Sequence, residues 1–383
     1  MRDFGLYIHI PFCVQICPYC AFTSVAGREE LYGRYVEAIC AEIRTAGRRG
    51  DRRALDTVFF GGGTPSIFAP DLLGRILKEA ESQWGLAAGA EVTIEANPGT
   101  VDQEKFRGFR AIGCNRLSLG VQSFLDEVLA FLGRVHSAEE AEKGYLMARA
   151  AGFDNVSMDL IFSIPQVPAG YWQFALEWAA ELGPEHISAY SLTIEEGTAL
   201  ARGLQRGSLV QIEEEEDAQN FELASEFLVG EGYEHYEVSN FARPGRRSRH
   251  NWGCWTGAEY LGVGLSSHSF VDGRRSWNTR DLDTYLKRLE RGASPCEGEE
   301  VIGPVTALRE RIWMGLRTCQ GVFLTESQKD KLKGQSRFGE FVEAGLLEFS
   351  GEWLRLTSSG FVLADGLGVE VAELLEKEDA GEG

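Results

Sequence analysis

Residues 6–20 read LYIHIPFCVQICPYC, a short apolar run followed by three cysteines with the spacing C-x3-C-x2-C. Three thiolates held this close together can bind three irons of a cubane iron–sulfur cluster, which leaves the fourth iron without a protein ligand. A small molecule can chelate such an open iron and accept an electron from the reduced cluster. The stretch therefore predicts a [4Fe-4S] cluster on Cys13, Cys17 and Cys20.

Three different roles for these cysteines fit the sequence less well. Residues spaced i, i+4 and i+7 can line one face of a helix, but Pro11 and Pro18 disfavour a continuous helix here. A disulfide framework is typical of short secreted domains, whereas this chain is long and shows no secretory signal. A structural zinc ion usually takes four ligands from paired clusters, and no second CxxC pair or HxxxH follows in the sequence.

The composition is that of a soluble globular protein. The chain has 383 residues, of which 44% are hydrophobic and 25% charged, so we expect two or three domains. A net charge of −20 disfavours a nucleic-acid-binding protein, which would carry a basic excess. The N-terminus lacks the apolar core of a signal peptide, and no run approaches the roughly 18 apolar residues of a membrane helix. We therefore expect a cytoplasmic protein with no integral membrane segment, no nucleic-acid partner, and cysteines that are reduced or metal-bound.

Short apolar runs alternate with amphipathic stretches over the first half of the chain. The expected strands cover residues 6–10, 57–60, 91–96, 116–120, 155–160 and 186–192, and the expected helices cover 30–46, 71–84, 102–111, 137–151 and 170–182. The helix that starts at Ser137 has an N-cap residue followed by acidic residues in its first turn. Repeated strand–helix units predict an α/β fold with a parallel sheet, curled into a full or partial barrel or lying open.

Polar or glycine-rich residues follow five of these strands, and in β/α barrels functional residues cluster at the carboxyl ends of the strands. The features are the cysteine loop, Gly61-Gly62-Gly63-Thr64-Pro65, Glu95 with Asn97, Gln122, and Asp159. Taken alone, each of them is typical of a turn, a packed residue or the surface. Their common position nevertheless predicts one site at the mouth of the barrel, where glycines would let the backbone approach a ligand and Arg134 would pair with a carboxylate.

The second half of the chain has a different pattern. We expect a barrel over residues 1–235, a connecting segment over 236–300 with the basic loop RPGRRSRH, and a C-terminal domain over 301–383. In that last part FVEAGLLEFSGEWLRLTSSGFVLADGL predicts helix, two-stranded hairpin and helix, as in a winged-helix shape. No basic recognition helix is visible, so we expect a packing or partner surface there. Glu213–Asp217 is expected to start a helix, and the acidic tail 376–383 is expected to fray.

The combination of the C-x3-C-x2-C loop with GGGTP resembles the radical S-adenosylmethionine superfamily. The stretches YIHIPFC, FFGGGTPS, EANPG, RLSLGVQSF and MDLIFSIPQ resemble, more closely, the family of oxygen-independent coproporphyrinogen III dehydrogenase and its HemW-type relatives. The resemblance covers most of the chain. It implies a partial (β/α)6 barrel followed by a C-terminal α/β winged-helix-like module.

The resemblance also implies roles for individual residues. Cys13, Cys17 and Cys20 match the ligands of the [4Fe-4S] cluster. S-adenosylmethionine bound to the cluster would be held by Tyr7, Gly62 and Glu95. The positions that hold a second S-adenosylmethionine in the dehydrogenase are matched by Gly63, Thr64, Gln122, Arg134 and Asp159. No residue is implied as catalytic.

Two branches of the family differ near the cysteine loop. The dehydrogenase carries a further cysteine two residues after the third, and Phe22 stands at that position here. The loop instead resembles the HemW branch, which is implicated as haem chaperones and carries an H-N-x-x-Y-W motif tied to haem. This chain has His250-Asn251-Trp252-Gly253-Cys254-Trp255, with Cys254 in place of the tyrosine.

The motif implies that His250 contacts haem, although a histidine beside Asn and Trp is often only a hydrogen-bonded structural residue. Cys254 is the less favoured ligand, because a single cysteine is commonly inert core. His268 lies on a second family-like stretch. Arg246, Arg247 and Arg249 could meet haem propionates or simply face solvent.

The implied function is that of a haem chaperone. It would bind haem and pass it to an acceptor protein, with a cluster, S-adenosylmethionine and an electron donor for the cluster. The alternative is an oxygen-independent coproporphyrinogen III dehydrogenase that decarboxylates propionates by radical chemistry. The sequence leaves open whether the protein is an enzyme.

Overall fold

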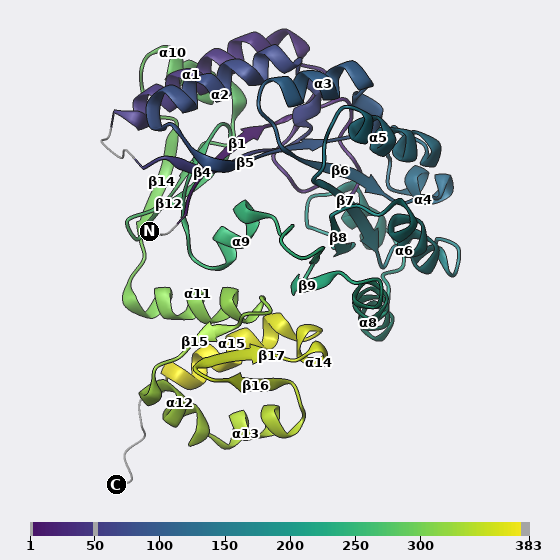
Figure 1. Cartoon of the computed structure of the whole chain (residues 1–383), viewed down its shortest axis with the longest axis vertical. Coiled ribbons are helices and arrows are strands. Elements are labelled where there is room, and N and C mark those ends of the chain that lie inside the picture. The colour runs from purple at the N-terminus through teal and green to yellow at the C-terminus, as the bar shows by residue number, and fades with distance from the viewer. Residues whose placement is uncertain (1–2, 49–52, 377–383) are drawn as a thin grey trace.

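The computed structural model describes residues 3–48 and 53–376, and one large curved sheet organises most of them (Figure 1). Its twelve strands follow the order β14-β13-β12-β11-β1-β4-β5-β6-β7-β8-β10-β9. The six strands from β1 to β8 in this order pair in parallel, which confirms the predicted partial (β/α)6 barrel. These strands are β1 (Phe4–Ile10), β4 (Leu55–Gly62), β5 (Leu86–Ala96), β6 (Arg116–Gln122), β7 (Val156–Phe162) and β8 (His186–Ser191).

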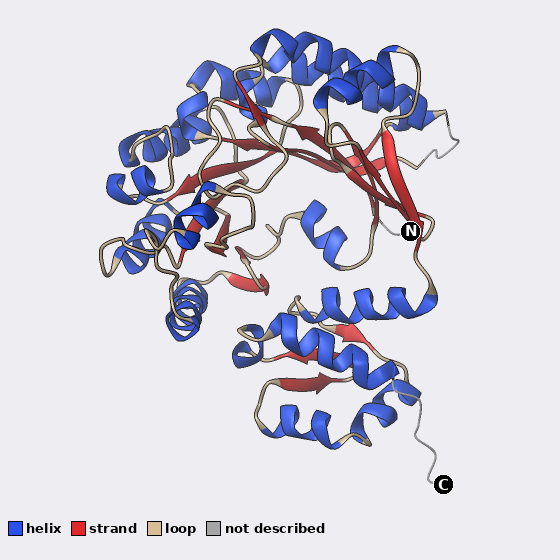
Figure 2. Ribbon diagram, turned by 180° about the vertical axis from the view of Figure 1, so that it is seen from behind, coloured by secondary structure: helices blue, strands red, loops and turns tan. Residues whose placement is uncertain are grey.

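Helices cover the convex face of this sheet (Figures 1 and 2). They are α1 (Tyr32–Gly47), α2 (Pro70–Trp84), α3 (Gln103–Ala111), α4 (Asp126–Phe131), α5 (Ala138–Ala150), α6 (Tyr171–Leu182) and α8 (Glu214–Gly230). The short helix α7 (Ala199–Gln205) lies instead against the cysteine loop, where the Leu200 amide donates to the Pro18 carbonyl at 3.0 Å. Single 3-10 turns η1 (Glu29–Leu31), η2 (Pro65–Ile67) and η3 (Pro98–Thr100) lie between them. Within the described residues, no helix is both long and apolar enough to cross a membrane.

Local sequence explains these elements. All residues of β7 are buried except the half-buried Asp159, as expected for a parallel strand covered on both faces. Helix α5 begins with the predicted N-cap, since Ser137 and Glu140 form a reciprocal capping box. Glu213 directly precedes α8, which carries four acidic residues in its first turn, where negative charge interacts favourably with the helix dipole.

The segment predicted as a connection, 236–300, contributes strands to both edges of the same sheet. Strand β11 pairs in parallel with β1 and is followed by three antiparallel strands, while β10 and β9 continue the sheet beyond β8. Helix α9 (Arg249–Trp255) lies on the concave side of the sheet (Figure 1). The remaining elements are β9 (Glu234–Glu237), β10 (Asn240–Ala242), β11 (Glu259–Val263), β12 (His268–Val271), β13 (Arg274–Asn278), α10 (Leu282–Glu290) and β14 (Cys296–Val301). The domain boundaries at 235 and 300 remain predictions.

The C-terminal part has its own hydrophobic core, which includes Ile312, Leu354 and Val371. The expected hairpin is β16–β17, and β15 adds a third strand that the sequence did not reveal. The elements are α11 (Pro304–Leu316), β15 (Val322–Phe323), α12 (Glu326–Lys333), α13 (Ser336–Glu343), β16 (Leu347–Ser350), β17 (Trp353–Leu356), α14 (Ser358–Phe361) and α15 (Ala364–Glu376). The tail expected to fray lies, after Glu376, outside the described residues.

A buried carboxylate ties α1 to the strands added at the β1 edge. Glu42 is 8% exposed and accepts hydrogen bonds from Tyr285 Oη at 2.6 Å, Asn278 Nδ2 at 2.6 Å and the Gly264 amide at 2.9 Å. A buried carboxylate is tolerated only when it is hydrogen-bonded in this way. The added strands are thus fixed to the barrel through one side chain.

Replacing Glu42 with alanine should lower the free energy of unfolding by at least about 2 kcal/mol, because three buried donors lose their acceptor. Urea denaturation followed by circular dichroism measures the effect. Glu37→Ala on the same helix is the matched control, since Glu37 is exposed and forms a surface ion pair with Arg75. Equal effects of the two substitutions would contradict the role given to Glu42.

Candidate functional site

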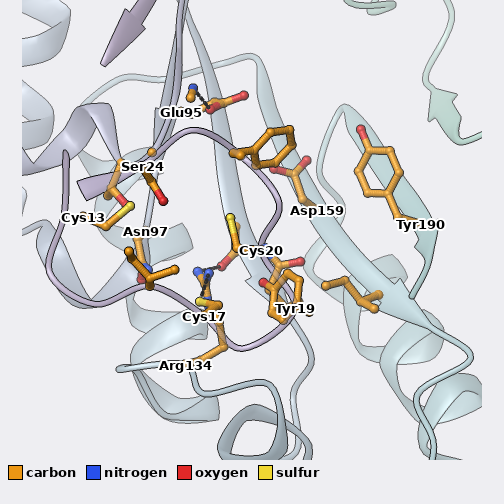
Figure 3. A pocket seen from close by; sticks show the side chains of 18 of the residues that line it. Cys13, Cys17, Tyr19, Cys20, Ser24, Glu95, Asn97, Arg134, Asp159 and Tyr190 are labelled. Carbon is orange, nitrogen blue, oxygen red and sulfur yellow. Dashed lines mark hydrogen bonds between the residues drawn. The ribbon is translucent and has the colours of Figure 1, made fainter. Parts of the chain in front are cut away.

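The carboxyl ends of the central strands open into a cavity of about 350 Å³, here called the cysteine cavity (Figure 3). All predicted site residues except Tyr7 and His250 line it. They are Cys13, Cys17, Cys20, Gly62, Gly63, Thr64, Glu95, Gln122, Arg134 and Asp159. The structure thus brings together residues from five strand ends, as the sequence predicted.

The cysteine loop leaves β1 through the short strand β2 (Phe12–Cys13), which pairs with β3 (Val25–Ala26) on the far side of the loop. The Cys20 amide donates to the Cys17 carbonyl at 3.1 Å, so a tight turn separates these two side chains. All three thiols are free of disulfides. Burial raises the pKa of Cys13 and Cys20.

Two polar side chains point at the sulfur atoms. Thr64 Oγ1 donates to Cys13 Sγ at 3.5 Å, and Arg134 Nη1 donates to Cys17 Sγ at 3.7 Å. Arg134 Nε is buried and has no partner among the described residues. Hydrogen-bond donors and a positive charge near sulfur stabilise thiolates, and thiolate is the form that binds metal.

The donor set fits a cubane cluster. In the described ranges, no group of three or more His, Cys, Asp or Glu side chains is arranged to hold a single metal ion. A cubane attaches its cysteines to separate irons, so its three sulfurs do not need to share one centre. Three free thiols around one cavity, with donors directed at two of them, are the ligands such a cluster requires.

The glycine loop lies directly against the start of the cysteine loop. The amides of Gly63 and Thr64 donate to the carbonyls of Ile10 and Phe12, each at 2.8 Å. A Cβ on Gly63 would lie 2.8 Å from the Phe12 carbonyl oxygen. Gly62 has φ +115°, and a Cβ there would lie 2.5 Å from His9 Cε1. Only glycine fits at these two positions.

Two carboxyl groups, those of Glu95 and Asp159, line the cysteine cavity. Glu95 accepts a hydrogen bond from the Gly62 amide at 3.0 Å, and burial raises the pKa of Glu95 to about 8, with a further contribution from the Asp159 carboxyl. Asp159 accepts from Ser118 Oγ at 3.1 Å and from Ser157 Oγ at 3.3 Å, and burial raises its pKa too. Glu95 is therefore positioned to ionise when a cation or a hydroxyl donor binds beside it.

The end of β6 is irregular where it reaches the cavity. Gln122 has φ +68°, a left-handed conformation that side chains rarely adopt and that often marks a functional position. Arg134 Nη2 donates to the Gly120 carbonyl at 2.9 Å. Arg134 therefore joins the end of β6 to the cysteine loop.

Tyr7 and His250 line a second cavity of about 480 Å³, here called the histidine cavity. The resemblance grouped Tyr7 with the S-adenosylmethionine residues, but the structure turns its hydroxyl to His9 Nδ1 at 3.0 Å. Glu95 and Phe22 line both cavities. The two cavities are therefore neighbours that share residues.

His250 is 7% exposed and lies in the first turn of α9, which Ser248 caps. Its Nδ1 is 2.8 Å from Thr57 Oγ1, and its ring centroid is 5.2 Å from that of Phe59 and 6.4 Å from that of Tyr7. Nε2 has no hydrogen bond to a described residue. Burial lowers the pKa of His250 to about 4, so the imidazole is neutral at neutral pH and has a lone pair available for a metal.

The other residues that the sequence suggested as haem contacts have surroundings less suited to that role than those of His250. Cys254 lines the histidine cavity, but burial raises the pKa of its thiol to about 11, which disfavours the thiolate. Arg247 pairs with Glu234, and Arg249 lies near Asp3 and Asp56. Neither Arg247 nor Arg249 lines the histidine cavity, and their contact with haem propionates stays a prediction.

Sequence reasoning missed several residues of the histidine cavity, among them His9, Thr23 and Arg280. His9 Nε2 lies 2.9 Å from the Thr23 carbonyl oxygen, so His9 connects Tyr7 with the end of the cysteine loop. The position of His9 inside the quoted motif was a signal for it. Arg280 carried no such signal.

Comparisons with known proteins identify the family of the chain. The model of the Radical SAM superfamily matches residues 7–179. A protein of Synechocystis named heme chaperone HemW is 38% identical over 90% of this chain and 86% of its own length. A protein of Mycobacterium tuberculosis with the same name is 36% identical over 96% of this chain and 94% of its own length.

A solved structure shows the same fold. Coproporphyrinogen III oxidase (HemN) from Escherichia coli, described as a radical SAM enzyme, superposes with a TM-score of 0.82 at 22% identity. The superposition covers 98% of this chain and 90% of that one. With relatives above 30% identity over nearly the whole chain, the protein belongs to the radical SAM superfamily and, within it, to the HemW family.

Proposed function

We propose that this protein is a cytoplasmic haem chaperone that binds haem in the histidine cavity and passes it to an acceptor protein. The observation that carries the proposal is His250, a buried neutral imidazole whose Nε2 is unpaired within the described part of the chain. Imidazole is an established axial ligand of haem iron. The HemW names of the relatives support the same function.

In this proposal the cysteine cavity holds the cluster and S-adenosylmethionine. Cys13, Cys17 and Cys20 would ligate the cluster, and Gly62 and Glu95 would face the nucleoside. When bound and reduced by an electron donor, these two groups together supply radical chemistry, which belongs to the cofactors. The chain itself orients them, and Arg134 keeps a positive charge beside Cys17.

The second candidate is radical decarboxylation of coproporphyrinogen III. Its specific support is that one cavity is lined by all the residues that match the dehydrogenase positions for a second S-adenosylmethionine. These residues are Gly63, Thr64, Gln122, Arg134 and Asp159. Phe22, where the dehydrogenase has a cysteine, disfavours this activity. Anaerobic turnover of coproporphyrinogen III by the reconstituted protein would establish this activity. If the protein binds haem but shows no such turnover, the chaperone function is favoured.

Cys17→Ala should abolish the visible absorbance and the spin signal of the cluster after anaerobic reconstitution, because one of three thiolate ligands is lost. Cys296→Ala is the control, since Cys296 lines neither cavity. An unchanged [4Fe-4S] spectrum of Cys17→Ala would show that the ligand assignment is wrong.

His250→Ala should weaken haem binding by about tenfold or more and shift the Soret band, since an iron–nitrogen bond is lost. Cys254→Ala should have a smaller effect because its thiol is held protonated. Titration of the purified protein with hemin measures both. The reverse order of effects would assign the iron ligand to sulfur.

The affinity of the cluster-loaded protein for S-adenosylmethionine should rise between pH about 6.5 and about 9, as Glu95 loses its proton and gains a charge that attracts the cationic ligand. Equilibrium dialysis across this range measures the dependence. Glu95→Gln should remove most of the rise. A rise of the same size in Glu95→Gln would assign the titration to another group.

A further inference from the structure

The histidine cavity contains more nitrogen donors than one axial ligand requires. Three of the six histidines in the chain line it: His9, His250 and His268. Both ring nitrogens of His9 are engaged, by Tyr7 and by the Thr23 carbonyl. His250 has one ring nitrogen without a hydrogen bond to the described residues, and His268 has two. The cavity therefore offers two histidines, on α9 and on β12, to one ligand.

His268 is the first residue of β12, and its exposed ring stacks on Trp277 of the neighbouring strand. The two ring centroids are 6.0 Å apart and the planes differ by 26°. The backbone of His268 packs so closely on β11 that a Cβ at Gly262 would clash with its carbonyl oxygen. Gly262 is the register partner of Tyr7, which also lines the cavity. These contacts fix the ring at the edge of the cavity.

Arg280 lines the same cavity, and its side chain forms no hydrogen bond or ion pair with residues 3–48 or 53–376. The neighbouring Arg275, in contrast, is held by Glu300 and Glu310. Arg280 is exposed and has no carboxylate partner among the described residues, although the chain has 58 acidic and 38 basic residues. A guanidinium in this state is suited to bind a carboxylate of a ligand.

We propose that His268 and Arg280 complete the haem site. His268 supplies a second nitrogen ligand to the iron held by His250, and Arg280 pairs with a propionate. The rings of Tyr7, Phe59 and Tyr260 line the same cavity and offer apolar contact to the macrocycle. The inference rests on the proposed function, and it adds a selection for porphyrins that carry both a metal and free carboxylates.

The test uses the full chain and three probes: hemin, hemin dimethyl ester and iron-free protoporphyrin IX. Arg280→Gln should weaken the binding of hemin and of protoporphyrin IX by about tenfold each, because Arg280 recognises free carboxylates. It should leave the binding of hemin dimethyl ester unchanged. Arg291→Gln is the matched control, an exposed arginine that lines neither cavity.

His268→Ala should convert hemin bound to the protein from a low-spin six-coordinate form to a high-spin form, seen by electron paramagnetic resonance. It should leave protoporphyrin IX binding unchanged, since that probe has no iron. Circular dichroism confirms that each variant is folded.

The outcomes separate the two levels of inference. Suppose that His250→Ala abolishes hemin binding, whereas His268→Ala and Arg280→Gln change neither the affinity for hemin nor its spin state. This result would overturn the inference and leave the proposed function in place. No hemin uptake by the unmodified protein would overturn the proposed function itself. Equal weakening of free-acid and esterified hemin in Arg280→Gln would reject the carboxylate contact.

Discussion

The close approach of two backbone segments at Gly62 and Gly63 is the constraint on which the cysteine cavity depends. Neither position has room for a side chain, because a Cβ would strike His9 in one case and the carbonyl of Phe12 in the other. The absence of these side chains lets the end of β4 hydrogen-bond to the first residues of the cysteine loop. The hydroxyl of Thr64 then reaches Cys13, and the Gly62 amide reaches Glu95. A larger residue would separate the sulfur atoms from the carboxyl group.

Much of this architecture could be predicted from the sequence, because parallel strands leave a clear signal. Strands covered on both faces are nearly continuous apolar runs, and their polar ends, such as Asp159 in β7, stand out against that background. Since all parallel strands end at the same rim, residues far apart in the chain could be assigned to one site. The cysteine cavity follows from that rule alone.

The histidine cavity could not be predicted in the same way. Its wall includes β11 and β12, which are short, only partly buried, and follow no regular alternation. Tyr7 of β1 and His250 of α9 belong to it because α9 packs against β4 on the concave side of the sheet. There the His250 ring lies beside the rings of Tyr7 and Phe59. Arg280 follows the last residues of β13 and has no motif around it. Only the folded sheet brings these residues to one place.

The two cavities share a wall that includes Glu95. A Cβ on Gly61 would touch Phe59, Tyr7 and Glu95, which shows how tightly these groups are packed together. Arg116, buried in the same interior, favours the ionised form of Glu95 and the neutral form of His250. The electrostatic state of one cavity is therefore not independent of the other.

Because Glu95 lines both cavities, its charge acts on both of them. A cation that bound beside Glu95 would favour loss of its proton, and the resulting negative charge would also act on a ligand in the histidine cavity. Thermodynamic reciprocity requires that each occupant change the affinity of the other by the same factor. Ligands of the two cavities would in that case be coupled through the protonation of one side chain.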